Sequence, residues 1–406
     1  MSILDEGLLS EVQARFGNNP LYIKNSEIKD GLKKYVLYTL TGSSVNNTDI
    51  NRRYSDFFAL RKKLCERWPG IYIPNIPKKK AVGNLEITTI LSRTKLLNLF
   101  SERLSKYDYL LSSEEFNLFL SDQPNIAKQL EKMPSLKYEE LCEKYKQAFP
   151  ELTVVESYDD EFHKEKVLDF MAYLRKAMLN IKHFKDMVSF ALESKNKEFE
   201  HYVSFLESFD DYEKYGLLEY ADNDEKKLVF FNPNNPELLE RINKTKEKFT
   251  NPFEDIIEWL SGEEIDIEAM IDAVNGYENL IELRRKTEDK YQSLERGLRE
   301  LQIIDKKSWK EVVHRKSKTE VIEEKQAEIK RNREESELLK KIIKYVTFHL
   351  NTVIACAKKE KLKEYYQHLK KFVAVQKEND KNIKDLWELI AHNKNILEEK
   401  KKGKNN

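Results

Sequence analysis

The chain has 406 residues, of which 35% are charged, and it contains only 11 glycines and 10 prolines. This balance favours long helices over a loop-rich or disordered protein, and the length predicts two or more domains. Lys plus Arg and Asp plus Glu are equal at 71 each, so net charge points to no partner, and no nucleic-acid partner is expected.

Three cysteines, Cys65, Cys142 and Cys356, lie far apart and form no CxxC pair. Reduced cytosolic thiols are therefore expected instead of disulfides or a metal site, and no cofactor is expected. No window approaches ~18 consecutive apolar residues, the length that a membrane-spanning helix needs. The N-terminus also lacks the basic start and apolar core of a signal peptide. Any membrane contact is thus expected to be peripheral and on the cytoplasmic side.

The N-terminal part predicts a small α+β domain. Residues 1–20 are expected to be a flexible lead-in. Three β-rich segments follow, with a hairpin-type turn at Asp30-Gly31 between the first two. The segments are Leu21–Lys29, Lys33–Thr41 and Asp49–Tyr54. They predict a small antiparallel three-stranded sheet with helices packed on one face.

A basic motif lies at the end of the third segment. Arg52-Arg53-Tyr54 precedes an amphipathic helix, and Pro74-Asn75-Ile76-Pro77 is followed by Lys78–Lys80. Arginine donates two hydrogen bonds to phosphate oxygens, tyrosine stacks on a ring, and paired prolines stiffen a loop. One interpretation is an anionic-ligand site. The other is a solvated helix start followed by a PxxP turn.

The order RRYSDF, helix, PxxPxK resembles the phox-homology (PX) domain, which reads phosphoinositide lipids, over about Leu21–Gln123. We place the domain at residues 21–125. The resemblance implies that Arg53 holds the 3-phosphate and that Tyr54 packs against the inositol ring. It also implies that Lys79 lies near the 1-phosphate and that Arg93 reaches the ring hydroxyls. One departure is Asn75, where the family often has a second proline.

Residues Ala81–Leu91 carry Val82, Leu85 and Ile87. They are either an ordinary approach to a helix or, as the PX resemblance implies, a loop that inserts into the bilayer beside the bound head group. Helices are predicted at Arg93–Tyr107 and Ser113–Leu120.

Residues 126–158 are expected to form a linker with one short amphipathic helix, Leu136–Phe149. One face of this helix carries Tyr138, Cys142, Tyr145 and Phe149. This face either packs against a neighbour or lies on a membrane surface.

Long amphipathic helices are predicted over residues 159–402. The first starts at Asp159, the second runs from Asn251 to about Gln302, and the third from about Thr319 to Lys400. Apolar residues recur in each at spacings of three and four, but residues Tyr212–Glu240 interrupt the pattern. The stripe of the third helix includes Leu339, Ile343, Val346, Leu350, Ile354, Leu362, Tyr366, Leu369, Val373 and Leu386.

The second long helix starts with Asn251-Pro252-Phe253-Glu254. Asn as N-cap, Pro at the first helical position and Glu at N3 explain every residue as a helix start. Asn-Pro-Phe also looks like a short ligand for endocytic adaptor domains.

A basic segment, residues 303–318, separates the second and third long helices. Its cationic residues are Lys306, Lys307, Lys310, Arg315, Lys316 and Lys318. They form either a solvated connection or a tip that grips an anionic membrane.

Helices of ~50 to 80 residues span ~75 to 120 Å at 1.5 Å per residue, and one copy cannot cover all their stripes. An antiparallel three-helix bundle that dimerises is therefore expected. The run YYQHLKKFVAVQKENDKNIKDLWELI resembles the closing helix of a BAR domain. With the PX segment ahead of it, the chain resembles a PX-BAR sorting nexin.

This resemblance implies a dimer that binds phosphatidylinositol 3-phosphate on endosomes and senses or generates curvature in retrograde or recycling transport. Retromer or other sorting nexins are the implied partners. The alternative is a PX-targeted coiled-coil scaffold that does not bend membranes. An enzyme is not expected, because HExxH, GxxxxGK[ST] and GxSxG are all missing. His349 and Cys356 form either a metal pair or, as we expect, a core-facing pair.

Overall fold

The computed structural model describes residues 6–30, 34–46, 48–79, 83–153, 160–220, 236–303 and 318–391. The chain folds as two compact units. The first unit comprises Met1–Met178 and Glu264–Ala357, and the second comprises Leu179–Glu263 and Lys358–Asn406. Each unit is described below by itself.

The first unit begins with the predicted sheet. Strands β1 (Tyr22–Lys29), β2 (Tyr35–Thr41) and β3 (Ile50–Arg53) pair antiparallel in the order β1-β2-β3. A short 3-10 helix, η1 (Ser43–Val45), lies between β2 and β3. The three-stranded sheet with helices, expected from the alternating β-rich segments, is confirmed. The turn at Asp30-Gly31 falls partly outside the described residues.

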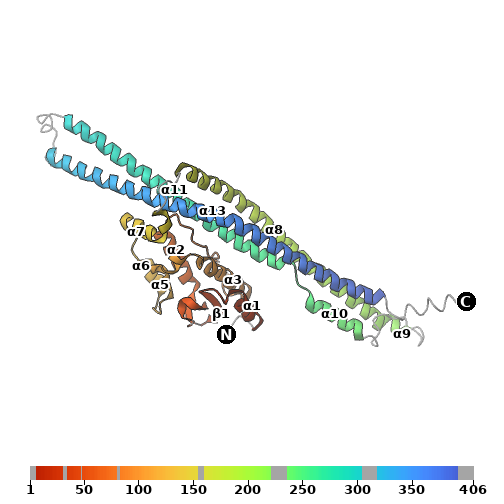
Figure 1. Ribbon diagram of the computed structural model, residues 1–406. Helices are drawn as coiled ribbons and strands as arrows, with labels where there is room; N and C mark the ends of the chain where they lie inside the picture. The colour runs from red at the N-terminus through yellow and green to blue at the C-terminus, as the bar shows by residue number, and fades with distance from the viewer. Residues whose placement is uncertain are drawn as a thin grey trace. The chain divides into compact units, whose positions relative to one another are not determined.

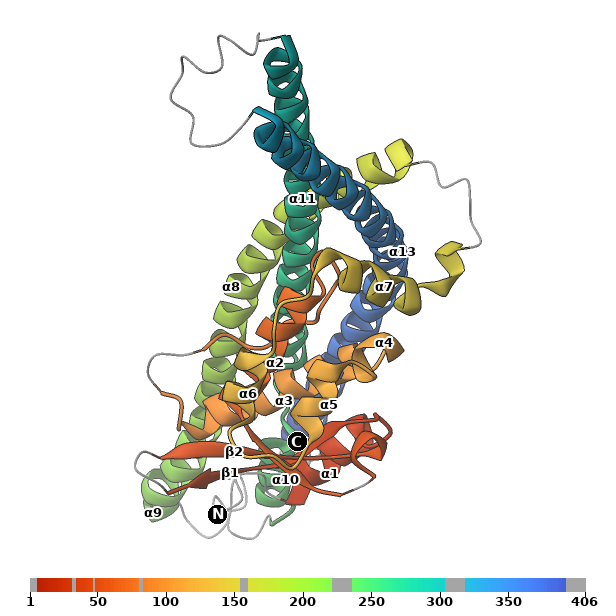
Figure 2. The ribbon, with the colours of Figure 1, turned by 90° about the vertical axis from the view of Figure 1, so that its left-hand side faces the viewer.

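Four helices complete this fold: α2 (Tyr54–Arg67), α3 (Ile87–Leu104), α4 (Asp108–Leu111) and α5 (Glu114–Leu120). Figure 2 shows α2, α3 and α5 on one side of the sheet. Phe57 of α2 is fully buried, and its ring lies 5.1 Å from Phe119 and 6.2 Å from Tyr38 of β2. Aromatic pairs at this spacing add attraction beyond their buried area, so Phe57 holds sheet and helices together.

Two expectations for this region are corrected. The lead-in expected to lack order contains helix α1 (Glu6–Phe16), because Val12 and Phe16 bury their side chains against Tyr22. The helix expected at Arg93–Tyr107 begins earlier, at Ile87, and ends at Leu104.

The segment expected to be a linker contains two helices, α6 (Ile126–Lys132) and α7 (Tyr138–Ala148), followed by the 3-10 turn η2 (Pro150–Thr153). Of the two interpretations of the short amphipathic helix, packing is confirmed. Tyr145 is fully buried, stacks on Trp68 and donates its hydroxyl to the carbonyl of Pro69 at 2.7 Å. Leu141 and Phe149 are buried with it, whereas Cys142 is only half-buried.

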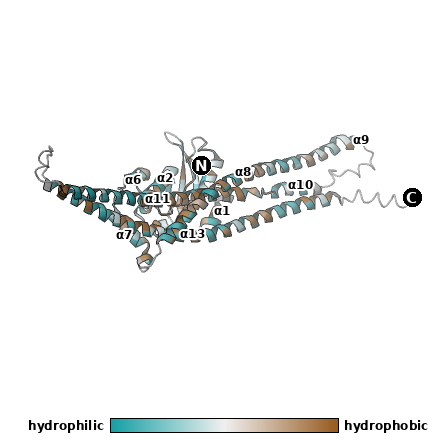
Figure 3. Cartoon of the chain, turned by 90° about the horizontal axis from the view of Figure 1, so that it is seen from above, coloured by the Kyte–Doolittle hydropathy of each residue, from teal (hydrophilic) through white to brown (hydrophobic). Residues whose placement is uncertain are grey.

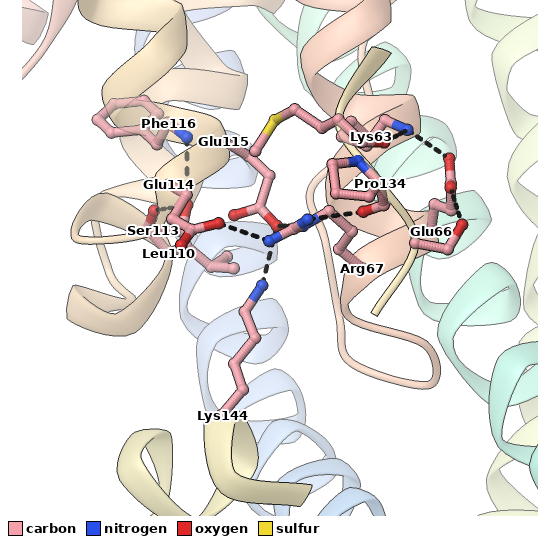
Figure 4. A network of polar contacts seen from close by, with 12 residues as sticks. Lys63, Glu66, Arg67, Leu110, Ser113, Glu114, Glu115, Phe116, Pro134 and Lys144 are labelled. Carbon is pink, nitrogen blue, oxygen red and sulfur yellow. Dashed lines mark hydrogen bonds and ion pairs between the residues drawn. The ribbon is translucent and has the colours of Figure 1, made fainter. Parts of the chain in front are cut away.

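A buried ion network fastens these helices to α2 (Figure 4). Arg67 donates to the carboxylates of Glu115 and Glu114, at 2.6 Å each, and to the carbonyl of Pro134 at 2.7 Å. Lys144 of α7 donates to the same oxygen of Glu115 at 2.8 Å. Burial raises the pKa of Glu115, but its bonds to Lys144 and Arg67 outweigh this and lower the pKa overall. The carboxylate is therefore held charged where water is excluded.

The first unit also contains parts of the three long helices, α8 (Asp160–Tyr212), α11 (Phe253–Ile303) and α13 (Lys318–Ala391). In this unit α11 and α13 lie side by side (Figures 1 and 2), with ion pairs Lys290–Glu328 and Arg333–Glu295 between them. The buried apolar residues of the three long helices in this unit include Val167, Leu174, Val274, Tyr277, Leu339, Ile343, Val346, Leu350 and Ile354. Polar residues such as Ser336 and Thr347 are buried there as well.

The second unit is built from the remaining parts of these helices and from α10 (Pro236–Lys248). A π-helical turn, η3 (Glu213–Leu217), and α9 (Leu218–Tyr220) follow α8. Two small clusters hold the unit together. One joins Val188, Ile256 and Leu260, and the other joins Leu206, Ile242 and Leu386.

Polar contacts in the second unit include a half-buried acid, Asp255. Burial raises the pKa of Asp255, but hydrogen bonds from His368 and Lys371 outweigh it and lower the pKa to about 2. The start of α11 is capped as expected: Asn251 accepts a hydrogen bond from the Phe253 N–H at 3.0 Å. Asn251 is itself buried and bonded to Leu192 and Asn196, which supports the capping interpretation over an exposed Asn-Pro-Phe ligand.

The apolar stripe of α13 is covered only in part in the second unit, where Leu386 is buried. Leu362 is 73% exposed and Tyr366 66% exposed, and Leu369 and Val373 are also exposed. On α8 the exposed apolar residues of this unit include Phe184, Met187, Phe190, Phe205 and Phe209. Figure 3 shows hydrophobic residues spread among hydrophilic ones along both helices.

Among the described helices, none is both long enough and apolar enough to cross a bilayer. The described residues also contain no group of three or more His, Cys, Asp or Glu placed to hold a metal ion. The expected core-facing pair is half right: His349 is buried, but Cys356 is exposed.

Candidate phosphoinositide site

The paired arginines at the end of β3 have different environments. Arg52 is buried and donates to the carbonyls of Phe119 and Ser121 at 2.7 and 2.6 Å, so it ties the end of α5 to the sheet. Burial lowers its pKa. Arg53, the next residue, is exposed, because successive side chains of a strand point to opposite faces. Arg53 is therefore the arginine of the pair that is open to a ligand.

Two contacts hold Arg53, one through its side chain and one through its backbone. Its guanidinium carbon lies 3.6 Å from the ring centre of Tyr35, within the range of a cation–π contact. Its backbone N–H donates to the carboxylate of Asp56 at 2.8 Å, which caps the start of α2. The guanidinium is thus oriented by Tyr35 while its edge remains exposed.

Tyr54 and Arg93 are in contact. The guanidinium carbon of Arg93 lies 4.5 Å above the ring of Tyr54, and its Nη2 donates to Asn84 Oδ1 at 2.9 Å. The Tyr54 hydroxyl donates to the carbonyl of Pro77 at 2.5 Å. Burial raises the pKa of this hydroxyl, and the nearby Arg93 opposes the rise. One tyrosine therefore joins the helix that carries Arg93 to the PxxP loop.

Lys79 is exposed two residues after Pro77. Its neighbour Lys78 is turned to α11, where its Nζ lies 2.5 Å from Glu268 Oε1. The structure thus brings Tyr54 and Arg93 into contact, places Arg53 next to Tyr54 in the chain, and leaves Lys79 exposed beside the carbonyl that Tyr54 holds.

Three residues around this site were not expected from the sequence: Tyr35, Asn84 and Glu268. Tyr35 could have been found from strand register, because Leu37 pairs with Arg53 and Tyr35 lies two residues away on the same face. Asn84 and Glu268 carried no local signal.

The residues expected to insert into the membrane are described only in part. Leu85 is 38% exposed and Ile87, the first residue of α3, is 61% exposed. Val82 lies outside the described residues. Gly83 has φ +76°, in the left-handed region that favours glycine, and accepts the turn bond from Glu86 N–H at 3.2 Å.

The basic tip lies almost wholly outside the described residues. This applies to Lys306, Lys307, Lys310, Arg315 and Lys316, while Lys318 is the first residue of α13. Its role remains a prediction.

A sheet of this topology with its helices, followed by three long helices, is the architecture of a PX domain joined to a BAR-type region. Residues 40–123 match the PX domain family, and they contain Arg53, Tyr54, Lys79 and Arg93. The cryo-EM structure of the SNX-BAR Mvp1 tetramer has the same fold. The structural match covers 92% of this chain and 100% of the Mvp1 chain, with a TM-score of 0.53 at 16% sequence identity.

Curated relatives align over part of the chain. The vacuolar protein sorting-associated protein vps5 of Schizosaccharomyces pombe is 31% identical over 111 residues, which is 25% of this chain and 19% of that protein. Sorting nexin-33 of Xenopus tropicalis is 32% identical over 93 residues, 23% and 17% of the two chains. Sorting nexin 1 of Arabidopsis thaliana is 38% identical over 73 residues, 18% of each. The alignments thus span less than a fifth of these relatives. Together with the fold, they confirm the resemblance to PX-BAR sorting nexins.

Proposed function

We propose that this protein is a peripheral membrane protein that binds phosphatidylinositol 3-phosphate on endosomes. The observation that carries the proposal is the arginine at the end of β3: Arg53 is exposed, supported by Tyr35, and adjacent to the Tyr54–Arg93 contact. Arginine donates paired hydrogen bonds to a phosphate, and an aromatic ring beside it suits the apolar face of an inositol. Lys79 supplies a second cation for the phosphate that links the head group to its lipid.

We further propose that the protein acts as a dimer joined through its second unit. The exposed apolar residues of α8 and α13 recur along each helix as a stripe. On an ordinary protein surface, exposed apolar residues are scattered singly. A second copy of this chain, or a related chain, would cover them. The Mvp1 structure is described as a tetramer, and this self-association supports a second chain of the same kind as the occupant.

A dimer presents two lipid sites to one membrane, so weak contacts multiply through effective concentration. With a basic tip on each copy, such an assembly would sense or generate curvature in endosomal sorting and in retrograde or recycling transport. Retromer or other sorting nexins are its proposed partners. A PX-targeted scaffold that does not bend membranes is the alternative, and electron microscopy of liposomes separates the two, since only the first forms tubules.

The lipid assignment is tested with Arg53→Ala. Loss of a charge-assisted phosphate contact costs ~1.5 to 3 kcal/mol, so liposome affinity should fall roughly 10- to 100-fold. Lys62→Ala, which removes an exposed charge from the same helix region, is the matched control and should bind as the wild type does. Equal co-sedimentation of both variants with liposomes at low lipid density would contradict the assignment.

The basic tip is tested separately. Lys306, Lys307, Lys310 and Lys316 changed together to Glu should leave dimerisation and soluble head-group binding intact. Tubulation should be lost, because each cation near an anionic surface contributes about 1 kcal/mol. Full tubulation at physiological salt would show that the segment is only a connection.

A further inference from the structure

The loop from Gly70 to Lys79 packs against two long helices, α11 and α13. Tyr72 donates its N–H to His349 Nε2 of α13 at 3.1 Å and its hydroxyl to Asp266 of α11 at 2.5 Å. Earlier in the loop, Gly70 approaches Gly276 of α11 so closely that a Cβ on Gly276 would lie 2.6 Å from the Gly70 nitrogen. The backbone of this loop is thus fitted against the helical region before it reaches the lipid site.

The last of these contacts is made by one carboxylate, Glu268 of α11. Its Oε1 lies 2.5 Å from Lys78 Nζ, and its Oε2 accepts from Asn75 Nδ2 at 3.3 Å. The side chain of Glu268 is only 20% exposed, whereas that of Lys78 is 69% exposed. The hydrogen bond to Glu268 raises the pKa of Lys78, which favours the charged form of the lysine. Glu268 therefore contacts one residue before and one residue after the segment Ile76-Pro77.

The other side of the same motif is held by the lipid site itself, through the hydroxyl of Tyr54 on the Pro77 carbonyl. Pro77 has a fixed φ and lies between these two anchors. Residues 74–79 form no helix or strand, so side-chain contacts, and not a backbone hydrogen-bond ladder, hold this segment. Lys79 is exposed and directly follows Lys78, the residue that Glu268 holds.

We propose that Glu268 of α11 is a positioning residue of the lipid site: by holding Lys78 and Asn75 it sets the direction in which Lys79 faces the phosphate. This inference rests on the proposed binding of phosphatidylinositol 3-phosphate. It makes a residue of the long helices part of the lipid-binding machinery, although it touches no lipid. Without Glu268, Lys78 competes with Lys79, and a long flexible side chain must be ordered at the moment of binding.

The test measures binding of soluble short-chain phosphatidylinositol 3-phosphate to the full chain by calorimetry. Glu268→Ala should lower affinity by about 3- to 10-fold, the size of a typical coupling between contacting residues. The sign is informative. Glu268 is an acid near an anion site, so a role through net charge alone predicts that its removal strengthens binding. Glu278→Ala is the matched control, since it removes the same charge ten residues along α11, ~15 Å away at 1.5 Å per residue.

Two double variants separate positioning from a general loss of structure. Glu268→Ala combined with Lys78→Ala should bind no more weakly than Lys78→Ala alone, because the two residues act as one contact. The exchange Glu268→Lys with Lys78→Glu should recover most of the lost affinity. Losses that multiply in the first pair, or affinity in Glu268→Ala equal to or above that of the wild type, would overturn the inference and leave the proposed function standing. A wild-type chain that does not bind the soluble lipid would instead overturn both.

Discussion

The same helix has two different surroundings in the two units. In the first unit the stripe of α13, including Leu339, Val346 and Leu350, is buried by residues of this chain. In the second unit Leu362, Tyr366 and Leu369 of the same stripe are exposed. The difference follows from what each unit contains. The first has the PX domain, α6 and α7 as well as long helices, whereas the second has only helices and two small clusters.

This contrast indicates two sources of stability. Buried apolar area contributes roughly 25 cal/mol per Å², so a unit that covers its stripe is stable by itself. A unit whose stripe is exposed gains this stabilisation only when a partner covers the stripe. The first unit should therefore respond to changes in its own core, and the second to changes at the surface that we assign to the dimer.

The largest effect is expected from breaking the exposed stripe. Leu362, Tyr366 and Leu369 changed together to Ser should convert the dimer into a monomer at micromolar concentration, because central apolar contacts carry most of the energy of an interface. Light scattering measures the mass directly. Phe58→Ser, which removes an exposed apolar residue from α2 of the PX domain, is the control and should remain dimeric. A triple variant that stays dimeric would place the interface elsewhere.

A smaller effect is expected from the buried network of the first unit. Arg67→Met keeps the volume of the side chain but removes the partner that Glu115 and the Pro134 carbonyl share. Breaking a buried pair from one side costs up to ~3 to 5 kcal/mol, and the loss here should be smaller because Lys144 stays bonded to Glu115. Thermal unfolding should show a lower midpoint for the first unit while light scattering still reports a dimer. Removing both acids' charges as well, with Glu114→Gln and Glu115→Gln, should recover part of the loss.

The sequence predicted what is local and repetitive, and missed what depends on distant contacts. The strands, the helix stripes and the motif from Arg52 to Lys79 were readable because alternation, spacing of three and four, and proline are properties of short segments. The sequence could not show that Arg52 is buried and Arg53 exposed, because this depends on the carbonyls at the end of α5 that Arg52 binds. Glu268 was out of reach for the same reason, since it meets Asn75 across 193 residues of chain.

Helices α1 and α6 were missed because their apolar residues are few. Val12 and Phe16 are too short a pattern to distinguish a packed helix from a flexible lead-in, and only contact with Tyr22 decides it. Likewise, the face of α7 could be predicted, but not whether protein or membrane covers it.

The smallest of these effects concerns a single histidine of the first unit. His349 of α13 is fully buried among Tyr107, Tyr109 and Phe149, and accepts the N–H of Tyr72. Burial lowers its pKa to about 3, against an ordinary value of 6.5. The folded state thus keeps His349 neutral, whereas the unfolded chain takes up a proton as pH falls below 6.5. Stability from this residue is therefore complete above pH 6.5 and is lost progressively from there down to about pH 3.

In that window the slope from His349 is about 1.4 kcal/mol per pH unit, the value for one proton. Urea unfolding of the wild type at pH 7 and pH 5, compared with His349→Gln, isolates the contribution. Glutamine offers Tyr72 an oxygen acceptor but does not titrate, so its stability should change less between the two pH values. Carboxylates such as Asp255 lose their stabilising charge only nearer pH 2 and affect both proteins equally. An identical loss of stability in both proteins between pH 7 and pH 5 would show that His349 takes up its proton without opening the junction between the loop and α13.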